Sequence, residues 1–380
     1  MAAARRSAVV TAVAAVSAFG RGADALLAAA LAGRPAFRPV DRFDVSRRRV
    51  GVAATLPGAP VLADELAGVV SDACAAAGLD ASQRAGSGLF LAVHGDPALA
   101  RAAEEDRPAH GAHALASALA SATGLAAGTA PRTYTSACVA ASTAVADAAA
   151  TVASGRADRV VVAGGYLVEP DQFALFDAGR ALATDGEVRP FSANRTGLLL
   201  GDGVAAVVVD PARAARDRGA PVLARLAGWG RSGDAYHVCQ PRPDGAGLAR
   251  AVTAALDRAG VPASEVGYVN AHGSGTRQSD AAEAAALHRA LGRHAGRVPV
   301  SSTKSVHGQA LEASGLLELV VTVLALRAGR LPVNAGYLGP DEDCRLDVVT
   351  EPARPLRTAY ALSLNAAFGG ANTALLVGAA

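Results

Sequence analysis

The fold is indicated first by the stretch TSACVAAS, residues 135–142, in which Cys138 stands where a strand should turn into a helix. The residues before it, 132–137, are typical of a β-strand, and the alanine-rich residues 138–154 are typical of an α-helix. The free amides and the positive dipole end of a helix N-terminus favour thiolate over thiol. Small neighbouring side chains would leave room for a substrate. The stretch therefore indicates a reactive cysteine, although a buried structural cysteine would fit it equally well.

Short strands alternate with longer helices on both sides of this stretch. The sequence predicts further strands at 88–93, 159–163, 204–209, 265–270 and 360–365. It predicts further helices at 64–77, 247–259, 279–291 and 312–327. This alternation is typical of an α/β protein with buried sheets.

A strand–turn–helix unit is expected twice. In the first half, strand 132–137 leads into helix 138–154. In the second half, residues 298–302 lead through a loop at 304–308 into helix 312–327. The residues themselves do not repeat, so the similarity is one of pattern. It predicts two related α/β halves, residues 1–210 and residues 211–380.

The composition excludes several classes of protein. Of the 380 residues, 51% are hydrophobic and only 4% aromatic, so the chain can build a large core of small side chains. The net charge of +2 and the lack of basic stripes give no reason to expect nucleic acid. The four cysteines are widely spaced, which predicts reduced thiols and a cytoplasmic protein without a metal site.

The apolar run 8–19 follows Arg5 and Arg6 and superficially resembles a secretory signal. It is rich in valine and contains Thr11 and Ser17, so a buried first strand that ends at Gly20 is the preferred interpretation. Other apolar stretches are short or interrupted by charge, and no membrane span is expected.

A second chemical motif is NAHGSGT, residues 270–276, at the end of a predicted strand. Glycines on both sides of Ser274 allow the backbone to approach a ligand closely. The hydroxyl groups of Ser274 and Thr276 could bind a polar chain. A histidine at a strand end before a glycine-rich loop, here His272, is more often functional than structural.

Taken in chain order, the motifs resemble those of the β-ketoacyl-acyl-carrier-protein synthases of fatty-acid and type II polyketide synthesis. The matching stretches are SAC at 136–138, RPF at 189–191, GDG at 201–203, DAYH at 234–237, NAHGSGT at 270–276, TKS at 303–305 and FGG at 368–370. The resemblance covers essentially the whole chain. It implies the thiolase fold, with two similar α/β halves in a layered αβαβα arrangement.

The resemblance implies a role for each matching residue. Cys138 resembles the nucleophile that accepts an acyl group from a carrier protein. His272 resembles one of two histidines that bind the malonyl thioester carbonyl and stabilise the enolate. Lys304 resembles the lysine that orders the site electrostatically, with Glu318 as its buried partner. A purely structural ion pair would explain Lys304 and Glu318 as well.

Three further features of the site follow from the same resemblance. The amide of Cys138 and an amide near Ala366 would form the oxyanion hole, in the closing loop that also carries Phe368. Ser274 and Thr276 would bind phosphopantetheine. No metal or other cofactor is implied, because the phosphopantetheine arm arrives with the substrate.

The sequence departs from the family pattern where a second histidine is expected. The run KSVHGQ, residues 304–309, has Gln309 at that position. Its amide is a neutral donor but cannot form an imidazolium or move a proton. His307 could take the role only if the loop shifted register by two residues.

Two other departures concern loops. Alanines replace an aromatic gate residue and a glycine before FGG, which would open the acyl pocket and stiffen the loop. The segment between Phe43 and Cys138 is also shorter than in typical members of the family.

These departures leave three functions open. The preferred interpretation is a β-ketoacyl synthase-type acyltransferase that condenses a Cys138-bound acyl group with a malonyl-type thioester. The first alternative is a chain-length-factor-like subunit of a ketosynthase heterodimer, and the second is a ketosynthase that transfers acyl groups without decarboxylation. The expected partners are an acyl carrier protein and either a second copy or another ketosynthase.

Overall fold

The computed structural model describes residues 7–94, 104, 110–125 and 130–380. The strands within these residues are β1 (Ala8–Ser17), β2 (Gly20–Arg21), β3 (Arg38–Pro39), β4 (Val52–Ala53), β5 (Gly88–Val93), β6 (Arg132–Tyr134), β7 (Val160–Tyr166), β8 (Gly203–Pro211), β9 (Ala224–Gly233), β10 (Val266–Asn270), β11 (Pro299–Ser301), β12 (Asp347–Val348), β13 (Tyr360–Ala366) and β14 (Ala371–Ala379). The helices are α1 (Ala23–Ala32), α2 (Leu62–Ala76), α3 (Ala81–Ala85), α4 (Ala112–Thr123), α5 (Ala140–Ala153), α6 (Pro170–Ala178), α7 (Ala212–Asp217), α8 (Ala246–Ala259), α9 (Arg277–Leu291), α10 (Lys304–His307) and α11 (Ser314–Ala328). Two short 3₁₀ turns, η3 (Ala137–Val139) and η6 (Leu311–Ala313), matter for the site.

The main sheet runs in the order β12-β11-β10-β13-β14-β9-β1-β8-β7-β5-β6. Among the described strands, its two parts are joined only by a short pairing between β1 and β9, in which Val9 faces Arg225 and Val10 faces Ala224. Strands β5, β6 and β7 are parallel in one part, and β10, β11 and β13 are parallel in the other. Because parallel strands end at the same edge, each part has an edge at which loops can gather functional side chains.

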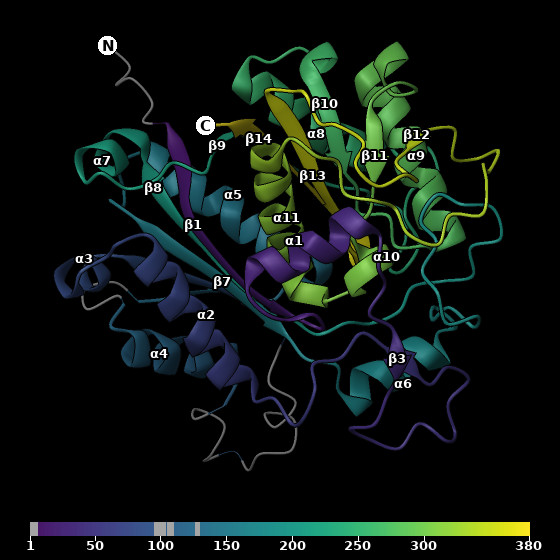
Figure 1. Ribbon diagram of the computed structural model, residues 1–380, viewed down its shortest axis with the longest axis horizontal. Coiled ribbons are helices and arrows are strands. Elements are labelled where there is room, and N and C mark those ends of the chain that lie inside the picture. Colours follow the sequence, from purple (N-terminus) through teal and green to yellow (C-terminus); the bar gives the residue numbers. More distant parts are fainter. Residues whose placement is uncertain (1–6, 95–103, 105–109, 126–129) are drawn as a thin grey trace.

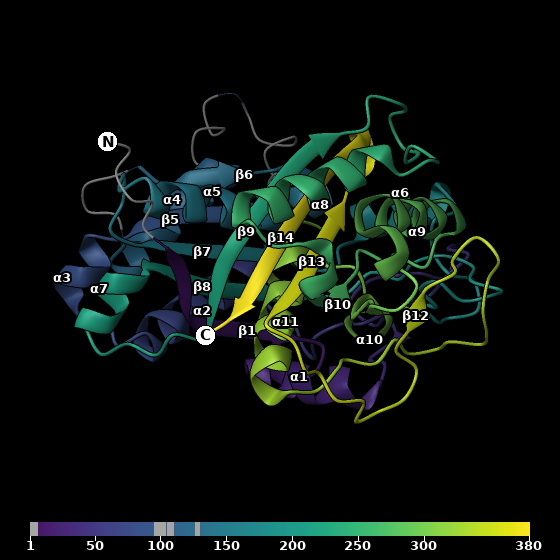
Figure 2. The ribbon, with the colours of Figure 1, turned by 90° about the horizontal axis from the view of Figure 1, so that it is seen from above.

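Helices α5 and α11 lie between the two parts of the sheet. Helix α5 packs on β5 and β7 of one part and on β14 of the other, and α11 packs on α5, β8 and β13. On the outer faces, α2 covers β1, β7 and β8, while α8 covers β9 and β14. Figure 1 shows α5 and α11 near the centre, with α2 and α4 on one side and α8 and α9 on the other, and Figure 2 shows α8 lying across β9 and β14. The result is the layered αβαβα arrangement of the thiolase fold.

Small and β-branched side chains explain why the central layers pack so closely. Strand β7 and strand β8 are buried along their full length, and α11 is buried through most of its length. These segments therefore have near-continuous apolar sequences instead of a one-sided pattern, as expected for elements covered on both faces.

Most of the predicted elements are present, with shifts of one to three residues at their ends. The apolar run 8–19 forms the buried strand β1. One prediction was wrong: residues 304–308, expected as a loop, contain the one-turn helix α10, which Gly308 ends with a φ of 75°. The predicted helix at 138–154 begins as the 3₁₀ turn η3 before α5. Part of the short segment between Phe43 and Cys138 lies outside the described residues, and the division at residue 210 stays a prediction.

Candidate active site

Cys138 lies just beyond the end of β6, in the turn η3 that leads into α5. Ala137, immediately before it, has a φ of 50°, a left-handed conformation that costs a non-glycine residue of the order of 1 kcal/mol. Cys138 is buried, with 8% of the residue's surface exposed. The strained turn thus places the thiol at the N-terminus of α5, at the edge where β5, β6 and β7 end.

Gln309 contacts the thiol directly. Its amide nitrogen Nε2 donates to Cys138 Sγ over 2.9 Å. The side-chain oxygen Oε1 accepts from Ser314 Oγ over 3.2 Å, and Ser314 Oγ also accepts from the Ala310 amide. Ser314 therefore turns the Gln309 side chain so that its NH2 group faces the sulfur. The sequence did not indicate Ser314, because nothing in its neighbourhood marks it as different from other helix-start serines.

His272 approaches from the second half of the chain, at the end of β10. Its backbone amide and that of Gly273 donate to the two oxygens of Glu283, both over 2.7 Å. Gly273 has a φ of 36°, and a Cβ there would lie 2.4 Å from Ser302 Cβ. Only glycine fits this turn. Glu283 and Gly273 together hold the loop that positions His272.

The His272 imidazole is neutral in this site. Burial, followed by the charge of Lys304, lowers the pKa of His272 well below its usual value. Its Nδ1 has no hydrogen-bond partner among the described residues. A neutral imidazole can still donate one N–H to a developing negative charge.

Lys304 lies behind His272 in a buried polar network. Its Nζ donates to the His272 carbonyl over 2.7 Å and pairs with Glu318 Oε1. Glu318 Oε2 accepts from Asn365 Nδ2 over 2.6 Å, and Lys304 and Glu318 are at most 1% exposed. Lys304 and Glu318 are thus paired as the sequence led us to expect, and the Lys304 ammonium of the pair faces the backbone of His272.

One cavity of about 340 Å³ lies where the carboxyl ends of strands from both parts of the sheet meet. Cys138, His272 and Gln309 line it, and so do the predicted residues Ser274, Thr276, Ala366 and Phe368. Lys304 and Glu318 lie behind the wall and do not line it.

The closing loop forms one wall of this cavity. The Phe368 ring stacks on Phe176 of α6, with centroids 5.9 Å apart, so Phe176 is a site residue that the sequence did not indicate. The backbone amide of Ala367 donates to the Ala371 carbonyl over 2.9 Å, so it is not free to donate to an oxyanion in the cavity. Ser274 and Thr276 bond each other through their hydroxyls over 2.9 Å at the same cavity.

The resting state of the nucleophile differs from the expectation of a thiolate. Burial, reinforced by the charge of Glu312, raises the pKa of Cys138 to about 12, against the opposing effects of Lys304 and the Gln309 amide. The favourable helix N-terminus is outweighed because the sulfur is removed from water. Cys138 is a thiol at neutral pH.

His307 does not replace the missing histidine. It is fully buried, its Nε2 bonds Thr303 Oγ1 over 3.0 Å, and it is absent from the cavity wall. The register shift that this role would need does not occur, because the backbone amide of Gln309 is fixed to the Leu199 carbonyl over 2.8 Å.

Two negative findings apply to the part of the chain that the structure describes. No group of three or more histidine, cysteine, aspartate or glutamate side chains there could hold a metal ion. No helix there is long and apolar enough to cross a membrane.

Comparison with known proteins gives a consistent result. The profile of the β-ketoacyl synthase N-terminal domain matches residues 63–215, and that of the C-terminal domain matches residues 223–337. The tetracenomycin polyketide synthase ketoacyl synthase alpha subunit of Streptomyces glaucescens is 42% identical over 233 residues, which are 60% of this chain and 54% of that protein. The chain thus spans about half the length of the curated relatives it matches.

Solved structures match over almost the whole chain. The ishigamide ketosynthase/chain length factor has a TM-score of 0.88 at 29% identity and covers 99% of this chain and 100% of its own. A type II polyketide synthase ketosynthase, in complex with its acyl-carrier protein and bound to the hexaketide, has a TM-score of 0.89 at 25% identity, with the same coverage.

Proposed function

The chain belongs to the β-ketoacyl synthase family, and from that premise we propose that it is a condensing acyltransferase of fatty-acid or polyketide synthesis. One observation carries the proposal: Gln309 Nε2 lies 2.9 Å from Cys138 Sγ, and His272 lines the same cavity. A nucleophile and two N–H donors in one cavity are the groups that thioester condensation requires.

The first step is acyl transfer to the enzyme. The Cys138 sulfur attacks the carbonyl carbon of an acyl thioester, and the bond from that carbon to the phosphopantetheine sulfur breaks. The thiol proton leaves Cys138 and ends on the released phosphopantetheine thiol, so the exchange is balanced. Backbone amides of Cys138 and of the closing loop near Ala366 would stabilise the tetrahedral oxyanion.

The second step is decarboxylative condensation. A malonyl thioester loses CO2, and the electron pair of the broken C–C bond forms an enolate. The N–H of neutral His272 and the Nε2–H of Gln309 donate to the enolate oxygen, with the Lys304 charge behind them. The enolate carbon attacks the acyl carbonyl on Cys138 and expels the sulfur, which takes up a proton and regenerates the thiol.

The substrates would arrive on a carrier protein. The solved neighbour that contains an acyl-carrier protein in complex with its ketosynthase supports such a partner. The hydroxyls of Ser274 and Thr276 line the cavity and suit the amides and hydroxyl of a phosphopantetheine arm. No metal is needed by this chemistry. A dimer with a second copy or with another ketosynthase is proposed on the same basis, since a neighbour pairs a ketosynthase with a chain length factor.

Intact-mass measurement after incubation with acyl and malonyl carrier proteins tests the proposal. Wild type should gain one acyl mass and release CO2, and Cys138→Ala should gain none. Cys239→Ala is the matched control, because Cys239 lines the same cavity but is exposed. It should acylate as wild type does.

A chain-length-factor-like role is the second candidate, and the observation that favours it is Gln309 in place of an imidazole. It predicts no acylation of Cys138 and co-purification with a second ketosynthase. Acylation without CO2 release would instead identify an acyltransferase that does not condense.

A further inference from the structure

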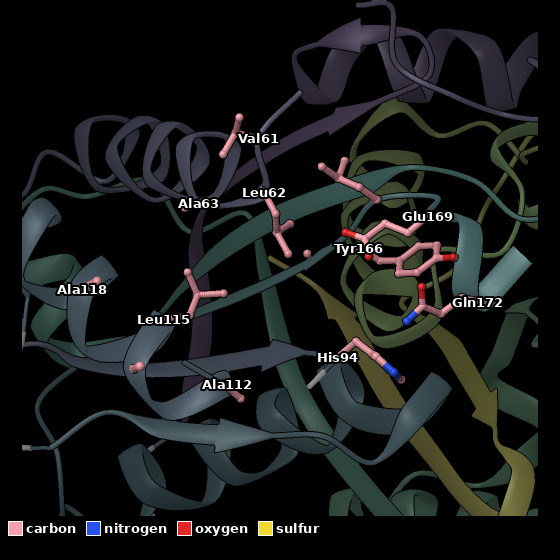
Figure 3. Close-up of a pocket in the computed structure, with 14 residues that line it drawn as sticks. Val61, Leu62, Ala63, His94, Ala112, Leu115, Ala118, Tyr166, Glu169 and Gln172 are labelled. Carbon is pink, nitrogen blue, oxygen red and sulfur yellow. The ribbon is translucent and has the colours of Figure 1, made fainter. Parts of the chain in front are cut away.

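A second cavity of about 370 Å³ lies between α2, α4 and the end of β7. Figure 3 shows that its walls differ in character: Val61, Leu62 and Leu115 lie toward one end, and His94, Tyr166 and Gln172 gather at the other. His94, which follows β5 directly, lines this cavity and also contacts Glu312, a residue close to the nucleophile. Its side chain is 50% exposed.

The inner edge of His94 contacts a buried carboxylate. His94 Nδ1 lies 2.9 Å from Glu312 Oε1, and the Glu312 side chain is 2% exposed. The second oxygen, Glu312 Oε2, has no hydrogen-bond partner among the described residues. A carboxylate buried in this way is costly unless it is paired, and His94 supplies its one ion-pair contact in the described residues.

The fold holds Glu312 beside the nucleophile. Glu312 belongs to η6, which packs directly on η3, the turn that carries Cys138. Leu311, just before Glu312, has a φ of 39°, as Ala137 before Cys138 has one of 50°. Glu312 and Cys138 therefore each follow a non-glycine residue in the left-handed conformation. Such strain persists only where the surroundings hold it, and it is concentrated at functional sites.

We propose that His94 and Glu312 form one positioning unit for Cys138, in which the protonated imidazole neutralises a carboxylate buried beside the thiol and so keeps that thiol able to react. The identity of Cys138 as the nucleophile rests on the proposed function. The effect of the pair on thiol reactivity does not, because it acts on the sulfur before any substrate binds.

The charges around the two groups give the direction of the effect. Glu312 and Glu318 disfavour the thiolate of Cys138, Lys304 and the Gln309 amide favour it, and His272 is neutral. Around the imidazole, the hydrogen bond to Glu312 raises the pKa of His94, and the charges of Glu312 and Glu169 act in the same direction. The exposed edge of His94 reaches the second cavity, so its proton can exchange with solvent. Loss of that proton would leave the Glu312 charge uncompensated at the thiol.

Alkylation of Cys138 by iodoacetamide tests this without any substrate. The rate is followed between about pH 6 and pH 9 by peptide mass, which separates Cys138 from the other cysteines. Glu312→Gln should alkylate faster than wild type at pH 8 by about 3- to 10-fold, because a lower thiol pKa gives more thiolate of slightly lower nucleophilicity. At the acid end of this pH range, where His94 holds its proton, His94→Gln should alkylate more slowly than wild type by a similar factor. The double variant should match Glu312→Gln, because His94 acts only through the carboxylate.

His288→Gln and Glu342→Gln are matched controls, since both side chains are exposed and neither is among the charges that act on the Cys138 thiol, so neither should change the rate. The proposal is overturned if His94→Gln leaves the rate unchanged, or if both single variants shift it in the same direction. Should His94→Gln fail to fold, Glu312→Gln alone decides: an unchanged rate overturns the proposal. If the variants alkylate as expected but wild type is never acylated from a carrier protein, the proposed function is wrong. The proposal for His94 and Glu312 still stands in that case.

Discussion

Cys138 begins the reaction as a protonated thiol, so the site must stabilise its thiolate when the substrate arrives. The pKa of about 12 means that little thiolate exists at neutral pH. His272 is a poor base, because burial and Lys304 disfavour its protonated form. The proton is therefore best transferred to the departing phosphopantetheine sulfur, in a thiol exchange assisted by the amide of Gln309 and the charge of Lys304.

Gln309 should behave as a hydrogen-bond donor that the reaction needs. Gln309→Ala removes the only side-chain donor within hydrogen-bond distance of Cys138 Sγ in the described residues, and malonyl decarboxylation should fall by about 100-fold, as for a lost oxyanion-hole donor. Gln309→His keeps an N–H and should stay within about tenfold of wild type.

Gln240→Ala is the control for this prediction, because Gln240 lines the same cavity but is exposed. Decarboxylation that survives in Gln309→Ala at the wild-type rate would show that the amide has no part in the chemistry. The measurement is CO2 release from malonyl carrier protein.

Breaking the Lys304–Glu318 pair should cost far more stability than breaking an exposed pair. Glu318→Gln leaves the Lys304 ammonium buried without its counter-ion, and we expect the free energy of unfolding to fall by about 3–5 kcal/mol. Asp217→Asn breaks the exposed pair with Arg213 and should cost less than about 0.5 kcal/mol. Chemical denaturation measures both. Equal losses in the two variants would contradict the assignment of Lys304 and Glu318 as a buried, coupled pair.

At the scale of elements, the site depends on how closely α11 approaches α5. Gly315, in the first turn of α11, faces the first turn of α5: a Cβ there would lie 2.8 Å from the Ser142 amide nitrogen and 2.9 Å from Asn365 Oδ1. The neighbouring residue Ser314 orients Gln309 toward Cys138. The close contact between the two central helices therefore also sets the position of the donor at the thiol.

Gly315→Ala should separate these helices and reduce stability by about 1–3 kcal/mol, in spite of the higher helix propensity of alanine. Acylation of Cys138 should slow as well, because Ser314, which orients the Gln309 side chain, moves with α11. Gly296→Ala is the matched control: no atom lies within 4 Å of its added Cβ, and its φ is not positive. Thermal unfolding and the acylation rate are the two measurements. A Gly315→Ala protein as stable as Gly296→Ala would show that the central layers tolerate expansion.

At the scale of the whole molecule, buried histidines make stability depend on pH. Burial, followed by the charge of Lys304, lowers the pKa of His307 to about 3. In the unfolded chain it would be near its ordinary value of 6.5. Between these two values the unfolded state binds one more proton than the folded state, so stability decreases as the pH falls below 6.5. His272 acts in the same direction.

His307→Gln should remove part of this acid sensitivity. Between pH 7 and pH 5, the wild type should lose about 2 kcal/mol more of its free energy of unfolding than the variant does. His288→Gln, at an exposed site, should retain the wild-type pH dependence. The quantity compared is the change between the two pH values, so a variant of lower overall stability still gives an answer. The same pH dependence in His307→Gln and wild type would refute the prediction.

The sequence alone was enough to predict the alternation of strands and helices and the order of the chemical motifs. Residues 88–93 form β5 as expected, because apolar β-forming residues between turn signals need little context to be recognised. Cys138, His272 and Lys304 were indicated because each follows a predicted strand in a recognisable motif. Gln309 was indicated because it stands where the family motif has a second histidine.

Tertiary structure alone decided which of these groups meet and how they titrate. His94 and Glu312 are 218 residues apart in sequence, and no local pattern marks either of them as the other's partner. The 2.9 Å contact between Gln309 and Cys138 joins residues 171 positions apart. The sequence led us to expect a thiolate at Cys138, because it shows only the local helix N-terminus. The structure instead gives a thiol, because the burial that raises the pKa of Cys138 comes from all the elements packed around it.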